Sequence, residues 1–530
     1  MKSTLKKSIS FVAAAILAAA MNSGCSQVGP DYVKPSEIEL PGTWEQNLTK
    51  SDANITQWWK SFNDPTLDDL VQKTYEQNLD LRSAGLRIVQ ARAALGISEG
   101  LLYPQQQTFS GSLAGVQNSG QTFTSAGINF DVGWEMDVWG KYARGIQSAE
   151  ATLYASVASY DDILVTIIAE VARDYINFRT AQERMAFAKR NIAIQRRVTK
   201  MTEVQFNAGN VSELDMQQAK TQLYTTESLL PGFELTMIKS RNAIAILLGT
   251  LPQEIDPLLY DKDELQRAYN YADDLFADDT LNSDLYKVES FIPVAAVDVN
   301  LSIDANLVRR RPDLQVAELQ AKAQSARIGS AEAELYPHFS LFGSIGYNTN
   351  DAGDGWISAG DAIGISAGPA FRWNIFQYGR IKNQVRLQDA LFQESLNNYN
   401  KKVLLAVQEV SNAVNGYRLT QKQLSLNAMA IDATVRAFNL SMTQYNNGLV
   451  TYQRLLSTVE KLTRNEDAYA QIRGNIGIQV ISLYKALGGG WEIGRNKAYV
   501  SAEDREQMKA RTDWGEYLDV NATMLPKADK

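Results

Sequence analysis

The sequence contains the stretch FNAGNVSELD (Phe206–Asp215) and, 239 residues later, its echo YNNGLVTYQR (Tyr445–Arg454). Each stretch has an aromatic residue three positions before a glycine and a β-branched valine two positions after it. Glycine at such a place is typical of a helix end that reverses the chain, because glycine tolerates positive φ. The equivalent residues are Phe206, Gly209, Val211, Tyr445, Gly448 and Val450.

The echo belongs to a duplication of most of the chain. LRSAGLRIVQARAALG (Leu81–Gly96) matches LQVAELQAKAQSARIG (Leu314–Gly329), and Trp139-Gly140 later matches Tyr378-Gly379. Ordered matches at a nearly fixed offset indicate that the chain contains two copies of one structural unit. We place the first repeat at residues 67–250 and the second at 309–488.

A period of two marks a β-hairpin in each repeat. From Ile128 to Val138 every even position is apolar and every odd position is polar or glycine, and Ile363–Ile375 follows a similar pattern. Phe109–Gly115 and Phe339–Tyr347 are their expected partners, giving hairpins at about 105–139 and 338–377. A one-sided soluble sheet would also alternate. The strand lengths and aromatic content favour strands that cross an outer membrane.

Very long helices follow the hairpins. The intervals between Gly140 and Gly209 and between Gly379 and Gly448 contain no proline. Each interval could extend roughly 100 Å as a helix. We expect each repeat to run helix, hairpin, long helix, tip turn near 209 or 448, and return helix. The apolar spacing is looser than a two-stranded heptad and suits a broad cylinder of helices.

Two hairpins supply four membrane strands, whereas a closed bacterial barrel needs at least about eight. Open strand edges in lipid would leave backbone groups unpaired, so the chain must oligomerise to cross the membrane. Three chains would supply twelve strands. The predicted fold is therefore mainly α with membrane β: an internally duplicated α-barrel of long antiparallel helices, with four transmembrane strands per chain forming a 12-stranded β-barrel in a trimer.

The N-terminus has the features of an export signal. Three lysines precede the apolar run FVAAAILAAAM, and Ser23 and Gly24 precede Cys25. Residues 1–24 therefore resemble a lipoprotein signal peptide with Cys25 as the lipidated residue, although Asn22 stands where leucine is usual. Ordinary cleavage nearby, with Cys25 a free thiol, is the alternative. We assign 25–66 to an N-terminal anchor, 251–308 to an acidic linker and 489–530 to a C-terminal equatorial tail.

Composition restricts the chemistry that the chain can perform. One cysteine and one histidine permit no internal disulfide, no Cys/His metal site and no histidine-based triad. The formal net charge of −8 argues against nucleic acid as a partner. We expect no enzymatic activity, no metal and no cofactor other than a covalent lipid on Cys25.

Taken together, these stretches resemble the outer-membrane factor family, the TolC-like exit ducts of tripartite efflux pumps, in its lipoprotein branch. The segments that carry the resemblance are WWKSFNDPTLDDLV (Trp58–Val71), RRPDL (Arg310–Leu314), YNNGLV (Tyr445–Val450) and YKALGGGW (Tyr484–Trp491). The resemblance implies a homotrimer in the outer membrane with a periplasmic helical tunnel. Its implied partners are a periplasmic adaptor, which would dock at the helix tips, and an inner-membrane transporter of the resistance-nodulation-division type.

The resemblance also implies a gate at the tips, formed by acidic residues six or nine positions after the two glycines. Asp215 fits this pattern in the first repeat, but Arg454 and Ser457 occupy the two positions in the second. Glu460 could substitute. We hypothesise that Arg454 contacts Asp215 or Glu213 and helps to close the pore; the alternative is that Arg454 points into solvent.

Two other functions remain open from the sequence. A duct for protein secretion would share every feature of an efflux duct, because the transporter selects the substrate. A periplasmic coiled-coil scaffold lipoprotein would explain the long helices and Cys25, but not two amphipathic hairpins at matching places.

Overall fold

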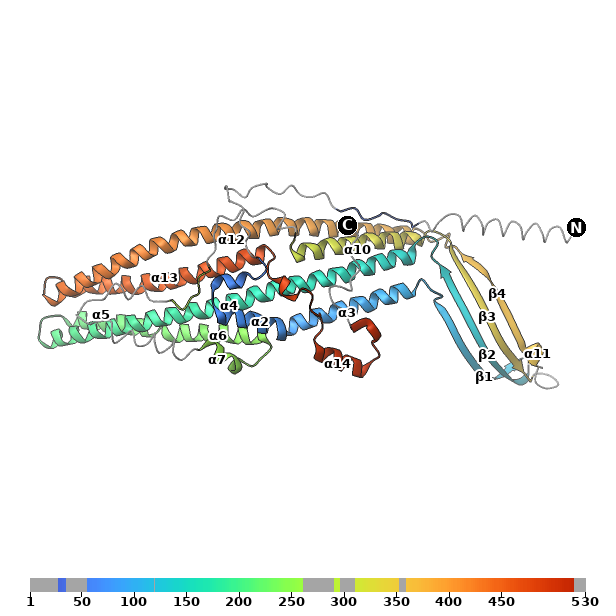
Figure 1. Ribbon diagram of the computed structural model, residues 1–530, viewed down its shortest axis with the longest axis horizontal. Coiled ribbons are helices and arrows are strands. Elements are labelled where there is room, and N and C mark those ends of the chain that lie inside the picture. Colours follow the sequence, from blue (N-terminus) through green and yellow to red (C-terminus); the bar gives the residue numbers. More distant parts are fainter. Residues whose placement is uncertain are drawn as a thin grey trace.

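The computed structural model describes residues 27–34, 55–118, 120–260, 290–295, 310–351 and 359–518. These residues form an elongated body, with long helices side by side and a β-sheet at one end (Figure 1). The predicted signal peptide with Cys25 and most of the acidic linker lie outside the described residues. None of the described helices is long and apolar enough to cross a bilayer.

The two repeats have the same order of elements. The first repeat and its flanks contain η1 (Trp58–Phe62), α2 (Pro65–Gln77), α3 (Leu79–Gly100), β1 (Gln106–Asn118), β2 (Gln121–Met136), α4 (Lys141–Asn207), α5 (Glu213–Glu227), α6 (Leu230–Leu248), η2 (Pro252–Ile255) and α7 (Asp256–Leu259). The second repeat contains α10 (Pro312–Ala333), β3 (His338–Asn350), α11 (Ala359–Ala362), β4 (Ile363–Arg372), α12 (Arg380–Asn446) and α13 (Tyr452–Ala486). The tail contains η4 (Trp491–Gly494), α14 (Ala502–Arg511) and η5 (Gly515–Leu518).

The long helices α4 and α12 each contain 67 residues, as the proline-free intervals predict. Each begins directly after a glycine at positive φ, Gly140 (75°) or Gly379 (84°). At about 1.5 Å per residue each helix is roughly 100 Å long. These two helices form the length of the body (Figure 1).

Two helices that the sequence pattern joins are interrupted. The helix predicted from residue 67 breaks at Asn78, whose Oδ1 accepts from the Leu81 amide while its Nδ2 donates to the Leu247 carbonyl. The first return helix is divided into α5 and α6. Pro231, near the start of α6, lacks the amide that a continuous helix would use. The second return helix, α13, runs unbroken for 35 residues.

The strands form one antiparallel sheet in the order β1-β2-β3-β4. β2 and β3 pair with each other, so the two hairpins are joined across the repeats. β4 ends at Arg372, three residues before the alternating pattern ends at Ile375. Arg372 pairs with His338, the first residue of β3, and the preceding Pro337 cannot donate to a ladder.

The largest core cluster lies where the helix pairs meet near the middle of the body. Trp58 is 1% exposed and stacks on Tyr484 with ring centroids 5.5 Å apart. Trp59 and Phe62 are buried beside it, so η1 is held against the helices by its aromatic side chains. Burial of such rings provides a large part of the hydrophobic stabilisation of this region.

Candidate channel surfaces and helix tips

The first helix tip is a tight reversal between α4 and α5. The Gly209 amide donates to the Phe206 carbonyl at 2.9 Å, and the Asn210 amide donates to the Gln205 carbonyl at 2.9 Å. Gly209 has φ of 80°. This hydrogen bonding with a left-handed glycine is the Schellman ending of a helix.

The second tip repeats this geometry between α12 and α13. The Gly448 amide donates to the Tyr445 carbonyl at 3.0 Å, the Leu449 amide donates to the Gln444 carbonyl at 2.8 Å, and φ of Gly448 is 71°. The echo in the sequence therefore corresponds to two equivalent helix reversals at the end of the body opposite the sheet (Figure 1).

The tips differ in how the return helix begins. At the first tip, the Asp215 amide donates to Ser212 Oγ at 3.2 Å, and the Ser212 amide donates to Asp215 Oδ2 at 3.1 Å. This capping box satisfies two backbone donors. At the second tip, Thr451 stands at the N-cap without a side-chain cap bond, and Arg454 occupies the place of Asp215.

The candidate gate residues do not form the predicted contact within one chain. Among the described residues, no ion pair joins Arg454 to Asp215 or Glu213. The Asp215 carboxylate instead accepts from the amide and hydroxyl of Ser212. The side chains of Glu213, Arg454 and Glu460 are exposed, whereas Asp215 and Ser457 are half-buried. Any closure through Arg454 would therefore have to involve a neighbouring chain.

Behind the exposed tip lies an aromatic core. Tyr445 and Tyr452 are each 3% exposed and meet edge to face, with ring centroids 6.0 Å apart. Burial, together with the charges of Asp215 and Glu460, raises the pKa of the Tyr452 phenol. Phe206 on the first tip is half-buried, as are Val211 and Val450. The adaptor-docking residues predicted from the echoes thus include both turn glycines at the surface and one buried tyrosine.

The sheet has one apolar face and one polar face. Phe109, Phe130, Ile345 and Ile365 are directly opposite one another across the four strands, and all are exposed. The adjacent row on the other face consists of Ser110, Asn129, Gly346 and Gly364. An apolar face toward lipid and a polar face toward a lumen are the pattern of outer-membrane strands.

Several apolar side chains of the long helix α12 are also exposed in the single chain. They recur along nearly its whole length: Leu387, Leu391, Leu404, Leu405, Leu419, Leu426, Met429 and Leu440 are exposed. Exposed apolar patches of this extent mark a surface that another protein covers.

Two polar links join α4 to α13, and sequence reasoning did not detect them. Glu466 is fully buried and accepts from Arg190 Nη2 at 2.5 Å and from Asn191 Nδ2 at 2.6 Å. Nearby, Arg184 binds both carboxylate oxygens of Asp467 at 2.7 and 3.0 Å. The partners are 275 to 283 positions apart, in different repeats, so no local sequence pattern indicates these contacts.

Both described ends of the chain fold back onto the helices. Arg144 donates to the Val28 and Gly29 carbonyls, which fixes residues 27–34 against α4 and α10. The tail packs on α3, where Arg82 binds Asp504 with two hydrogen bonds of 3.0 and 2.7 Å. The described part of the tail therefore lies beside α3 (Figure 1).

The duplicated chain has an amphipathic sheet at one end and a wall of long helices with exposed apolar side chains. These features define a class of protein, the membrane duct. The family model of outer membrane efflux proteins matches residues 70–250 and 305–489. The chain belongs to this family and is an outer-membrane exit channel of the TolC-like kind.

Named relatives and solved structures agree with this assignment. Nodulation protein T of Rhizobium leguminosarum bv. trifolii is 28% identical over 481 residues, which cover 88% of this chain and 96% of that protein. The pyoverdine export outer membrane protein OpmQ of Pseudomonas aeruginosa is 26% identical over 505 residues, covering 92% and 98%. The outer-membrane channel OprN has a TM-score of 0.72 at 28% identity, covering 88% of this chain and 99% of OprN.

Proposed function

We propose that three copies of this chain form a closed duct that passively conducts small molecules out of the periplasm, with no catalytic step of its own. The observation that carries the proposal is the four-stranded sheet with an apolar and a polar face and two unpaired edges, β1 and β4. In hydrocarbon, unpaired edge groups cost several kcal/mol each, so the edges need partners.

Cyclic association satisfies both edges with one kind of contact. β4 of one chain would pair with β1 of the next, and three chains would close a barrel of twelve strands. The same rotation would bring α12 of one chain against α3 of its neighbour, covering the exposed leucines of α12 and the exposed Leu79 and Ile97 of α3. Head-to-tail contacts of this kind generate rings when the rotation closes.

The partners follow from the two ends of such a duct. The six tips of a trimer, two per chain, would receive a periplasmic adaptor. The adaptor would connect the duct to an energy-consuming inner-membrane transporter of the resistance-nodulation-division type. Support comes from the relative OpmQ, whose name assigns it to pyoverdine export. A protein-secretion duct remains the second candidate, and a non-channel scaffold would leave the amphipathic sheet without a role.

We further propose that Cys25 is lipidated and anchors the mature N-terminus in the outer membrane. Residues 27–34 lie along α4 and α10 in the half of the body that carries the sheet, which supports an anchor on that side. A relative, SilC of Salmonella typhimurium, is named a probable outer membrane lipoprotein. Mass spectrometry of the mature N-terminus tests this proposal. A Cys25 peptide without acyl mass would contradict it.

The trimer is tested by measuring the mass of the detergent-extracted protein by light scattering, with Leu404→Glu and Leu419→Glu as variants on the exposed face of α12. We expect three chains in the wild type and dissociation when charges enter the interface. As a control, Lys322→Glu changes an exposed residue of α10 and should leave the trimer intact. A wild-type monomer, or variants that stay fully trimeric, would contradict the proposed packing.

A further inference from the structure

Resting on the proposed function, we propose that a recess in the sheet-proximal half of the helical wall is an anion-binding subsite on the path of the exported molecule. In it, Arg87 on one side and Arg327 on the other would each receive a carboxylate or phosphate group of the cargo.

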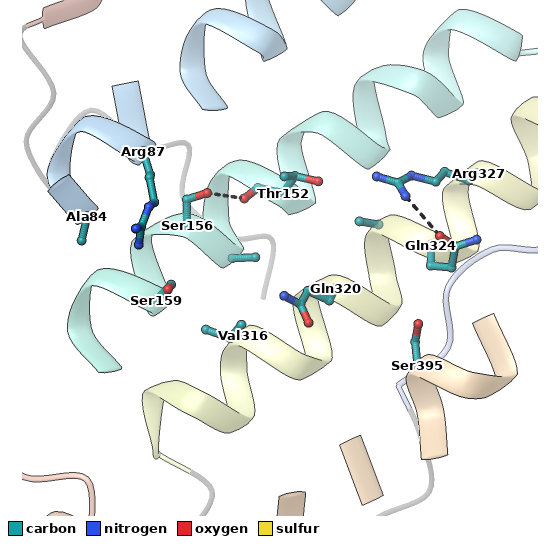
Figure 2. A pocket seen from close by; sticks show the side chains of 12 residues that line it. Ala84, Arg87, Thr152, Ser156, Ser159, Val316, Gln320, Gln324, Arg327 and Ser395 are labelled. Atoms are coloured by element: carbon teal, nitrogen blue, oxygen red, sulfur yellow. Dashed lines mark hydrogen bonds between the residues drawn. The ribbon is translucent and has the colours of Figure 1, made fainter. Parts of the chain in front are cut away.

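The recess has a volume of about 420 Å³ and is bounded by helices of both repeats. Figure 2 shows Arg87 from α3 on one side and Arg327 from α10 on the other, with hydroxyl and amide side chains between them. α4 contributes Thr152, Ser156 and Ser159, and α10 contributes Gln320 and Gln324. No acidic residue lines the recess. Its hydrogen-bonding groups are therefore neutral or positively charged.

Among the described residues, neither guanidinium group forms an ion pair with a carboxylate. Arg327 donates to two neutral oxygens, Ser148 Oγ at 3.2 Å and Gln324 Oε1 at 3.3 Å. Arg87 is exposed, and no carboxylate of the described residues forms an ion pair with it. Elsewhere on the helices Arg82, Arg184 and Arg190 each pair with an acidic side chain.

This contrast matters because the whole chain has a formal net charge of −8. Guanidinium presents donors in a fork that matches a carboxylate or phosphate in two-point contacts. Two such groups facing a polar recess are therefore suited to an anionic solute.

Helix geometry places the recess on the inner face of the wall. Gly329, two positions after Arg327, packs against the Val28 carbonyl of the N-terminal segment, and Gly85, two positions before Arg87, packs against the Tyr499 carbonyl of the tail. Residues two apart lie about 160° apart around a helix. The described N-terminal segment and the tail around Tyr499 therefore cover the face opposite the recess. That face must be the outside of the duct, since these segments would obstruct the lumen.

The test uses detergent-purified trimer and the variants Arg87→Gln, Arg327→Gln and the double variant. Lys322→Gln is the matched control, because Lys322 is exposed on the same helix as Arg327 but about 140° away from it. Binding of inorganic pyrophosphate and of citrate is followed by isothermal titration at low and high salt. Elution as a trimer shows that each variant is folded.

We expect wild type and Lys322→Gln to bind both probes, more weakly at high salt because exposed charges are screened. The double variant should bind about tenfold more weakly or not at all, the loss expected for charge-assisted contacts. Equal binding by wild type and the double variant, or no binding by wild type, would overturn the proposal.

A bilayer measurement on the same samples separates this inference from the proposed duct. Reversal potentials in a KCl gradient should shift toward cation selectivity in the double variant and stay unchanged in Lys322→Gln. A protein that forms no pore would refute the duct itself. A conducting pore with the same selectivity in all variants would refute only the anion subsite.

Discussion

The buried ion pair between Arg190 and Glu466 provides the sharpest energetic prediction. Glu466 is fully buried, the Arg190 side chain is 9% exposed, and the carboxylate also accepts from Asn191. Replacing Glu466 by glutamine keeps the shape but removes the negative charge that the buried Arg190 guanidinium contacts. Breaking a buried pair in this way costs about 3–5 kcal/mol. The loss should appear as weaker packing of α13 on α4.

Hydrogen exchange of the detergent-solubilised protein measures this cost locally. Amides of α13 around Glu466 should exchange roughly a hundredfold to a few thousandfold faster in Glu466→Gln, since 1.4 kcal/mol corresponds to a factor of ten. Arg190→Met combined with Glu466→Leu should restore most of the protection, because it removes both charges. As a control, Arg184→Gln breaks the more exposed pair with Asp467 and should cost about 1 kcal/mol or less.

Unchanged exchange in Glu466→Gln would refute the reasoning, and so would a double variant that is as poorly protected as the single one. The first result would mean that water or local rearrangement neutralises Arg190. The second would mean that the effect arises from packing and not from the uncompensated charge.

Three further predictions concern the tail, a buried acid and the first tip. Gly85→Val should release the tail from α3, because a Cβ at this position collides with the Tyr499 carbonyl. Limited trypsin digestion should then cut the tail sooner than in the control Gly100→Val, where the added side chain meets open space. Burial raises the pKa of Asp161 to about 7, and the charge of Glu492 adds to this effect. Ionisation of Asp161 therefore lowers the stability of the fold; the loss begins above about pH 4 and is complete above about pH 7. Asp161→Asn should therefore raise the melting temperature at pH 8 and have little effect at pH 4; an equal gain at both values would contradict this cause. Ser212→Ala should destabilise the start of α5 by about 1 kcal/mol, which faster amide exchange there would show. Thr451→Ala should destabilise α13 less, because Thr451 makes no side-chain cap bond. Equal losses in the two variants would argue against the capping box.

The regular parts of the fold could be predicted from the sequence because their signals are local. The alternation in Ile128–Val138 fixes which side chains share a face, and the proline-free intervals before Gly209 and Gly448 fix the two long helices. The duplication then places equivalent elements in both halves. These patterns depend on neighbours a few positions apart, which a single sequence displays directly.

The remaining features depend on residues that are distant in the chain. Asn78 interrupts a continuous apolar pattern because its amide reaches Leu247, 169 positions away. The pairing of Glu466 with Arg190 and the recess between Arg87 and Arg327 likewise need helices of both repeats to be in place. The capping box at the first tip is different, because Ser212 and Asp215 are three positions apart and the pattern S-x-x-D is a local signal that the sequence analysis did not use.

The measurement that tests the account most directly is the conductance of the purified, detergent-extracted protein in a planar bilayer, for wild type and Arg454→Ala. A trimeric exit duct predicts small, mostly closed wild-type currents of uniform size. If Arg454 helps to close the tips through a neighbouring chain, the currents should rise in the variant, whereas equal currents would limit Arg454 to a solvated role. Absence of any pore in both proteins, with extraction as a helical oligomer that does not span the bilayer, would contradict the duct and favour the scaffold.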